Sequence, residues 1–432
     1  MNQEDSFGSV KMAKRGGYPL FITILFIISL ALQLFYLYST DYLTRTYDVE
    51  GHIEHVKIIA TQHQIPSSER CWQCYHPPLY YLLSAGLVEL FNWKKNSKSL
   101  GRKLQIFSLF LFVLFQIVGV LIINFLLQEF WPRGIASVLF LFWPSGLINS
   151  VRVGNDDLFY LLQASSLFLL LLWMRKRRAF YLYESAIVAG LSILTKFNGA
   201  ITLAMLGGVA ILNVWKREEA IREGLKHALS VFIIGSLFLL ILLGIQTSKG
   251  GVYSNAAKLN PALSVEKSVV NLFTLDLKTY YRASFISPWI EKTGRKYFLN
   301  YLLKSSLFGE FWYKDRTSRT LARWASIVLL PLVGISLYGA CLALFRFDRM
   351  PLLLLGIFSI LALLLYHSRF WYGCTQDFRY IYPVVLSISI FIADGSEALR
   401  QYRWGSGARC CISILVGAFI LSGIGAIIWP LF

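Results

Sequence analysis

Charged residues are scarce in this chain. Only 15% of its 432 residues are Asp, Glu, Lys or Arg, whereas 56% are hydrophobic, and the mean hydropathy is +0.55. A soluble globular domain carries roughly 25% charged residues. The shortage of charged residues excludes a soluble enzyme and indicates a chain surrounded largely by lipid. The high aromatic content agrees with this, because Trp and Tyr form belts at bilayer interfaces.

Acidic residues are scarcer than basic ones: the chain has 24 acidic and 42 basic residues, which gives a net charge of +18. Such an excess often indicates nucleic-acid binding. Here, however, the basic residues flank apolar segments, as they do in membrane proteins that follow the positive-inside rule. We therefore expect the lipid bilayer, and no nucleic acid, as the partner of this charge.

Apolar segments recur along the whole sequence. They span residues 18–38, 78–91, 104–127, 135–149, 158–173, 183–194, 197–214, 229–245, 321–345, 351–366, 380–393 and 410–429. Inside a bilayer the backbone polar groups must be paired within each segment, so these segments are predicted to be helices. The expected fold class is all-α, a polytopic transmembrane helix bundle with about 11–12 spans and juxtamembrane helices in its outer loops.

The basic clusters orient the chain. The strongest is Arg175–Arg178, and others lie at 216–226, 346–349 and 400–409; all are expected inside. The predicted organisation is a cytoplasmic tail 1–17, a transmembrane module 18–247 with the first outer loop 39–77, a long outer segment 248–320 with interfacial helices, and a second module 321–432. The segment 367–379 is also placed outside.

One basic loop, 94–103, does not fit this scheme. It also has the composition of a cytoplasmic loop, yet three apolar segments separate it from Arg175–Arg178, and an odd number of crossings cannot return the chain to the same side. Either segment 78–91 or the Pro144-containing segment 135–149 fails to cross, or the loop 94–103 lies outside.

Cysteine is also rare, with six in the chain. Cys71 and Cys74 form a C-x-x-C in the first outer loop, and the sequence has no second pair at zinc spacing. A local disulfide, two free thiols and half of a metal site all remain open.

Ionisable side chains gather in the first outer loop, which holds four of the six histidines. Asp48 precedes a helix-like run at 49–60, where Asp48, His52 and His55 share one face and Glu50 lies on another. Asp48 either caps this helix or removes a proton from an acceptor hydroxyl or amine. Glu50 and His52 are candidates for shaping a pocket around it.

Four later sites carry further candidates. His76 precedes Pro77-Pro78, which suit a helix start, and its imidazole could contact a phosphate. Asp156 and Asp157 open an apolar run, either as dipole-favoured first-turn acids or as pocket carboxylates. Lys196 either snorkels or joins His76 in binding a phosphate. Arg379 either pairs with a neighbouring Asp or presents its planar fork to a phosphate.

Taken in order, these landmarks resemble the GT-C superfamily of polytopic glycosyltransferases, nearest to the branch of protein O-mannosyltransferases and lipid A aminoarabinose transferases. The matching stretches are Tyr47-Asp48, His76 to Tyr81, Asn155 to Asp157, Leu194 to Lys196 and Phe378 to Pro383. The resemblance implies transfer of a hexosyl or pentosyl group from a polyprenyl-phosphate donor, with inversion, at the periplasmic or lumenal face.

The same resemblance implies roles for individual residues. Asp48 would be the general base, His76 and Arg379 would contact the donor phosphate, and Asp156 would be a second pocket acid. Asp156 is also the candidate ligand for Mg²⁺ or Mn²⁺, although Arg and His can neutralise a phosphate without a metal. The acceptor would be a lipid, a glycan or a protein, and we expect a bacterial inner membrane rather than the endoplasmic reticulum.

Two rival functions remain. A transporter or flippase for a lipid-linked or anionic solute would also be polytopic, but it predicts inverted repeats and discontinuous mid-membrane helices, whereas these charges gather on one face. A metal-dependent hydrolase could use Asp48, His52 and His55, but the sequence lacks an H-E-x-x-H motif.

Overall fold

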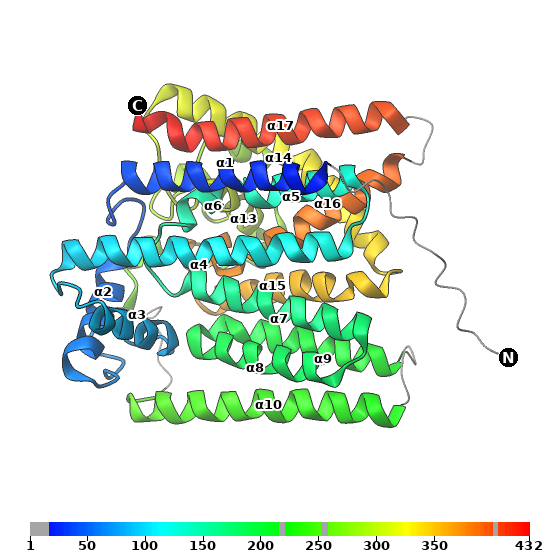
Figure 1. Ribbon diagram of the computed structural model, residues 1–432. Coiled ribbons are helices and arrows are strands. Elements are labelled where there is room, and N and C mark those ends of the chain that lie inside the picture. Colours follow the sequence, from blue (N-terminus) through cyan, green and yellow to red (C-terminus); the bar gives the residue numbers. More distant parts are fainter. Residues whose placement is uncertain (1–16, 216–220, 252–257, 401–404) are drawn as a thin grey trace.

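The protein is a bundle of long helices lying side by side along one axis (Figure 1). The computed structural model describes residues 17–215, 221–251, 258–400 and 405–432, and within these ranges it contains no strand. The helices are α1 (Tyr18–Ser39), α2 (Val49–Gln62), α3 (Leu79–Leu90), α4 (Ser97–Leu126), α5 (Phe130–Leu141), α6 (Pro144–Asn149), α7 (Asp156–Lys176), α8 (Ala179–Thr195), α9 (Ala200–Trp215), α10 (Ile221–Ser248), α11 (Val269–Phe273), α12 (Leu277–Arg282), α13 (Phe298–Phe308), α14 (Arg316–Ala343), α15 (Met350–Arg369), α16 (Val384–Arg400) and α17 (Gly405–Ile428). Residues 1–16 of the predicted tail 1–17 and the basic residues Lys216, Arg217 and Arg403 lie outside the described residues.

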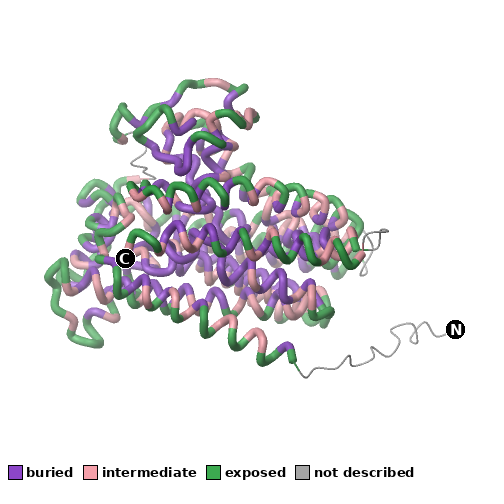
Figure 2. Tube along the Cα trace, turned by 90° about the horizontal axis from the view of Figure 1, so that it is seen from above, coloured by how far each residue is buried: buried purple, intermediate pink, exposed green. Residues whose placement is uncertain are grey.

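The all-α polytopic class is confirmed. Within the described residues, eight helices are long and apolar enough to cross a membrane, or nine if the bent pair 373–381 and α16 forms one span. Three shorter apolar helices, α3, α5 and α8, account for the larger number predicted from sequence. Figure 2 shows buried residues along the middle of the bundle and exposed residues on its outer helices, as expected for a surface solvated by lipid.

The short helix α3 lies beside α2 at one end of the bundle rather than crossing it (Figure 1). The loop after α3 contacts α2, since Lys95 Nζ donates to the carbonyl of Ala60 at 2.8 Å. Arg102, in the first turns of α4, donates to the carbonyl of Thr40 at 3.1 Å, so α4 begins where α1 ends. The basic loop 94–103 therefore lies on the same side as the first outer loop. We call this side the site end.

A buried arginine ties three helices together at the opposite end, which we call the far end. Arg349 is 1% exposed and holds Asp394 of α16 at 2.7 Å through Nε. Its Nη2 donates to the carbonyl of Leu126 at the end of α4, at 3.0 Å. Arg349 precedes α15 directly, so one guanidinium joins α4, α15 and α16.

Three breaks in the helices occur at Pro or Gly. The apolar segment 135–149, expected as one helix, is divided into α5 and α6 because Pro144 cannot continue the first helix and starts the second. The chain bends by 66° between residues 373–381 and α16, next to Pro383. Between α8 and α9, a Cβ on Gly199 would lie 2.3 Å from the backbone nitrogen of Ile193, so only glycine fits this turn.

Candidate active site

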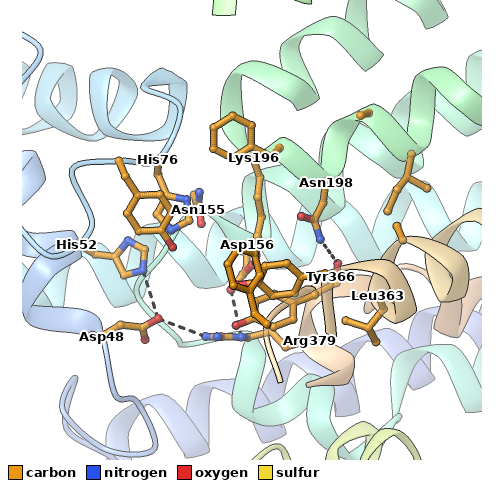
Figure 3. A pocket seen from close by; sticks show the side chains of 17 residues that line it. Asp48, His52, His76, Asn155, Asp156, Lys196, Asn198, Leu363, Tyr366 and Arg379 are labelled. Carbon is orange, nitrogen blue, oxygen red and sulfur yellow. Dashed lines mark hydrogen bonds and ion pairs between the residues drawn. The ribbon is translucent and has the colours of Figure 1, made fainter. Parts of the chain in front are cut away.

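A cavity of about 630 Å³ lies at the site end. Figure 3 shows its two different halves: Asp48, His52 and His76 lie on one side, and Leu363 and Tyr366 on the other. The lining residues come from the first outer loop, α2, the starts of α7 and α9, the end of α15 and the bend before α16. They are Asp48, His52, Tyr75, His76, Asn155, Asp156, Lys196, Phe197, Asn198, Ala200, Ile201, Ala362, Leu363, Tyr366, Phe370, Arg379 and Tyr380.

Asp48 occupies the N-cap position of α2, yet within the described chain its side chain accepts no capping hydrogen bond. It turns instead toward two arginines. Arg152 Nη2 lies 3.0 Å from Asp48 Oδ1, and Arg379 Nη1 lies 3.9 Å from Oδ2. Helix capping therefore does not explain the direction of this carboxylate.

The two arginines also determine the acidity of Asp48. Burial alone would raise the pKa of this carboxyl group, but the positive charges of Arg152 and Arg379 outweigh it and hold the pKa of Asp48 well below its usual range. Asp48 is consequently an ionised, strongly stabilised carboxylate before any ligand binds. A carboxylate in this state is a weak base.

Arg379 is held in place through its backbone. Asp377 accepts a hydrogen bond from Arg379 N at 3.0 Å, and Tyr160 Oη donates to the Arg379 carbonyl at 2.8 Å. Its guanidinium lies 3.7 Å from Asp156. That separation, like the 3.9 Å to Asp48, is long for a hydrogen bond. Among the described residues, Arg379 Nε has no hydrogen-bond partner, so this guanidinium keeps donors for a ligand.

Lys196 supplies the second cation of the cavity. Its Nζ is hydrogen-bonded to Asp156 Oδ1 and lies 5.0 Å from the centre of the Tyr380 ring. Asn155 Nδ2 donates to the carbonyl of Thr195 at 2.9 Å. This bond joins the start of α7 to the end of α8 and brings the Asp and the Lys to the same place.

His52 and His76 line the cavity as neutral imidazoles. Burial lowers the pKa of His52 to about 4, although the nearby Asp48 opposes the shift. Burial also lowers the pKa of His76 well below its usual value. His52 Nδ1 lies 2.8 Å from Tyr81 Oη, whereas His76 Nδ1 is buried with no hydrogen-bond partner in the part of the chain that the structure describes.

The structure does not bring two of the predicted pocket residues to the cavity. Glu50 is exposed on α2 and is absent from the described cavity lining, because it lies on another helical face than Asp48 and His52. Asp157 is 1% exposed and is also absent from the described cavity lining. Its carboxylate oxygens have no hydrogen-bond partner among the described residues.

Sequence reasoning gave no role to Arg152, Glu310 or Lys249. Arg152 pairs with Asp48 across 104 positions of sequence. Burial, with the nearby Asp377, raises the pKa of Glu310 to about 8. Lys249 Nζ donates to the carbonyl of His76 at 2.8 Å. Arg152 was visible as the start of the motif that contains Asp156, but the other two lie in the long outer segment, where the sequence pattern is weak.

The cavity carboxylates do not fit a divalent metal ion. Asp48 and Asp156 are each paired with basic side chains, whereas Mg²⁺ or Mn²⁺ needs several oxygen ligands converging on one point. In the described ranges, the single group of three or more His, Cys, Asp or Glu that could hold an ion is His55, Cys71 and Cys74, outside the cavity.

No protein-family model matches the chain, and no curated protein matches it. Solved structures do match. The oligosaccharyltransferase of Archaeoglobus fulgidus in the apo form has a TM-score of 0.59 at 15% identity, covering 96% of this chain and 56% of that one. AglB from the same organism, in complex with an inhibitory peptide and a dolichol-phosphate, gives 0.57 at 16% identity, with 95% and 56% covered.

ArnT from Cupriavidus metallidurans bound to undecaprenyl phosphate gives a TM-score of 0.51 at 12% identity, covering 94% of this chain and 71% of that one. The chain therefore has the fold of the GT-C membrane glycosyltransferases, as the motifs predicted. It spans little more than half the length of the archaeal enzyme, 56%.

Proposed function

We propose that the protein is a membrane glycosyltransferase that moves a hexosyl or pentosyl group from a polyprenyl-phosphate donor to an acceptor hydroxyl or amine. One observation carries the proposal: a single cavity joins a charged half, with Arg379 and Asp48, to an apolar half between α9 and α15. Such a cavity suits an anionic headgroup attached to a hydrocarbon chain. The solved structures of AglB and ArnT with dolichol-phosphate and undecaprenyl phosphate support this class of donor.

In this proposal the prenyl chain lies along Ile201 of α9 and Leu363 of α15. The phosphate lies against Arg379, Lys196 and His76. Arg379 Nε and His76 Nδ1, which have no hydrogen-bond partner among the described residues, support this placement, because a buried donor or acceptor without a hydrogen bond is costly unless a ligand supplies one.

The chemistry then follows from charge. The acceptor oxygen or nitrogen attacks the anomeric carbon from the side opposite the phosphate, the bond to the phosphate breaks with its electron pair, and Asp48 takes the acceptor proton. The leaving phosphate becomes a dianion, so cations aimed at it stabilise the transition state more than the ground state. Drawing Arg379 toward the phosphate also weakens its hold on Asp48, which makes this carboxylate a stronger base when the donor is bound.

We place the cavity on the non-cytoplasmic side of the membrane. The basic cluster Arg175–Arg178 ends α7 at the far end, and Arg346 and Arg349 also lie there, which supports a cytoplasmic far end. The Cys71–Cys74 disulfide lies at the site end and supports an oxidising compartment there. Both agree with a periplasmic or lumenal cavity in a bacterial or endoplasmic reticulum membrane.

Purified protein incubated with a panel of polyprenyl-phosphate sugars tests the function. We expect one donor to be consumed when an acceptor extract is present, with release of polyprenyl phosphate and inversion at the anomeric carbon. Liposomes containing the protein distinguish the alternative, a transporter or flippase. Passage of the intact lipid across the bilayer, with no sugar released from any donor, would contradict the proposal.

The pairing of Arg152 with Asp48 predicts a pH effect. Both arginines lower the pKa of Asp48 below the usual carboxyl value of about 4. Asp48 should therefore stay ionised in the wild-type protein at every pH above about 5, and its protonation should not reduce the transfer rate there. In Arg152→Gln the pKa of Asp48 rises, so the acid limb of kcat/KM moves upward by about one pH unit or more. Acid limbs that coincide in the two proteins would show that Arg152 does not control the ionisation on which the rate depends.

A further inference from the structure

A second cluster of reactive side chains lies outside the cavity, where the loop after α2 folds back onto that helix. It contains Cys71, Cys74 and His55. One ligand atom from each lies within 4.8 Å of the others. His55 and Cys74 are fully buried and Cys71 is 8% exposed. The proposed transfer reaction uses none of these three residues.

The hydrogen bonding of His55 leaves one ring nitrogen able to bind an ion. Its Nδ1 lies 3.1 Å from the carbonyl oxygen of Gln73. A carbonyl only accepts, so Nδ1 carries the proton and Nε2 keeps its lone pair. Within the described chain Nε2 is buried without a hydrogen-bond partner. A backbone carbonyl that fixes one imidazole nitrogen while the other faces the ion is the usual arrangement around a metal-bound His.

The two cysteines are joined as a disulfide in this structure, and in that state their sulfurs cannot both bind an ion. A thiol or phosphine reductant supplies two electrons, and with two protons the S–S bond becomes two thiols. We propose that in this reduced state Cys71, Cys74 and His55 bind one zinc ion. Binding releases the two thiol protons and leaves a fourth position to water, which completes a tetrahedral site.

Short contacts connect the proposed zinc site to the cavity. The His55 ring stacks on Tyr81 with centroids 3.7 Å apart, and Tyr81 Oη lies 2.8 Å from His52 Nδ1. A Cβ on Gly51 would lie 3.1 Å from the backbone nitrogen of Gln73, so the cysteine loop packs tightly on the first turn of α2. The disulfide and the zinc ion are thus two ways of fixing this loop beside Asp48.

Cobalt titration of the full-length protein tests the site without any sugar donor. Protein reduced with a phosphine and then desalted should bind one Co²⁺ per chain, with thiolate charge-transfer and tetrahedral d–d bands that Zn²⁺ abolishes. The oxidised protein should show neither band. His55→Ala should weaken binding at least about tenfold, and Cys71→Ser should remove the charge-transfer band.

A matched control is the double variant Cys410→Ser and Cys411→Ser, which removes two exposed thiols of α17 and should leave the titration unchanged. Two results would overturn the proposal: reduced wild-type protein that binds Co²⁺ no more tightly than Cys71→Ser, or an unaltered spectrum in His55→Ala. Since the readout is spectroscopic, failure of this site leaves the proposed transfer reaction untouched.

Discussion

Asp48→Asn should lower kcat for sugar transfer by about 10³-fold, within the range for loss of a general base. Donor binding should be unchanged or tighter. Asp48 and the donor phosphate both attract Arg379, which lies 3.9 Å from Asp48. The neutral amide of the variant no longer attracts the guanidinium, so Arg379 can bind the phosphate without this competition. Single-turnover rates and a direct donor-binding measurement separate the two effects.

The matched control for this variant is Glu54→Gln, which changes an exposed carboxylate on the same helix and should leave both quantities near wild type. A normal transfer rate in Asp48→Asn would remove Asp48 from the reaction. A loss of donor affinity with kcat preserved would make it a binding residue instead of a base.

Arg379→Ala should lower kcat/KM for the donor by about 10³-fold, and Arg379→Lys should lie between this variant and wild type. Removing a preorganised group that stabilises developing charge costs about 10²–10³ in rate, and here the same group also binds the ground-state phosphate. Lysine keeps the charge but lacks the planar fork that can face Asp48 and a phosphate together.

Binding of polyprenyl phosphate, the product without its sugar, gives a readout of Arg379 that does not depend on catalysis. It should weaken in both variants, while Arg369→Lys, an exposed arginine at the end of α15, should bind it normally. Thermal melting of each variant checks that the remaining carboxylates have not unfolded the site end. Unaltered affinity for polyprenyl phosphate in Arg379→Ala would place the phosphate elsewhere.

Much of the fold was predictable because the backbone polar groups of a segment in lipid must be hydrogen-bonded within the protein. A long apolar segment such as 104–127 must be a helix, and α4 is one. Hydropathy does not distinguish a helix that crosses from one that lies at the end of the bundle, so the sequence left open whether segment 78–91, which contains the 12-residue α3, crosses. The place of α3 depends on its packing against α2, which a local pattern cannot report.

The candidate site was predictable to the extent that it depends on the side of the membrane on which each segment lies. Asp48, His76 and Arg379 were all assigned to outer segments, and the structure brings them to one cavity, while their roles stay predictions. The partner Arg152 depends on a contact 104 residues away. The grouping of His55 with Cys71 likewise depends on how the loop folds back on α2, and neither pairing leaves a local signal.

The arginine clamp at the far end has a mechanical consequence. Arg349 fastens the first turn of α15 to Asp394 of α16 and to the last carbonyl of α4. This anchor fixes the start of α15 relative to α4 and α16. It therefore also sets the level in the bundle at which the later α15 residues Leu363 and Tyr366 meet the cavity.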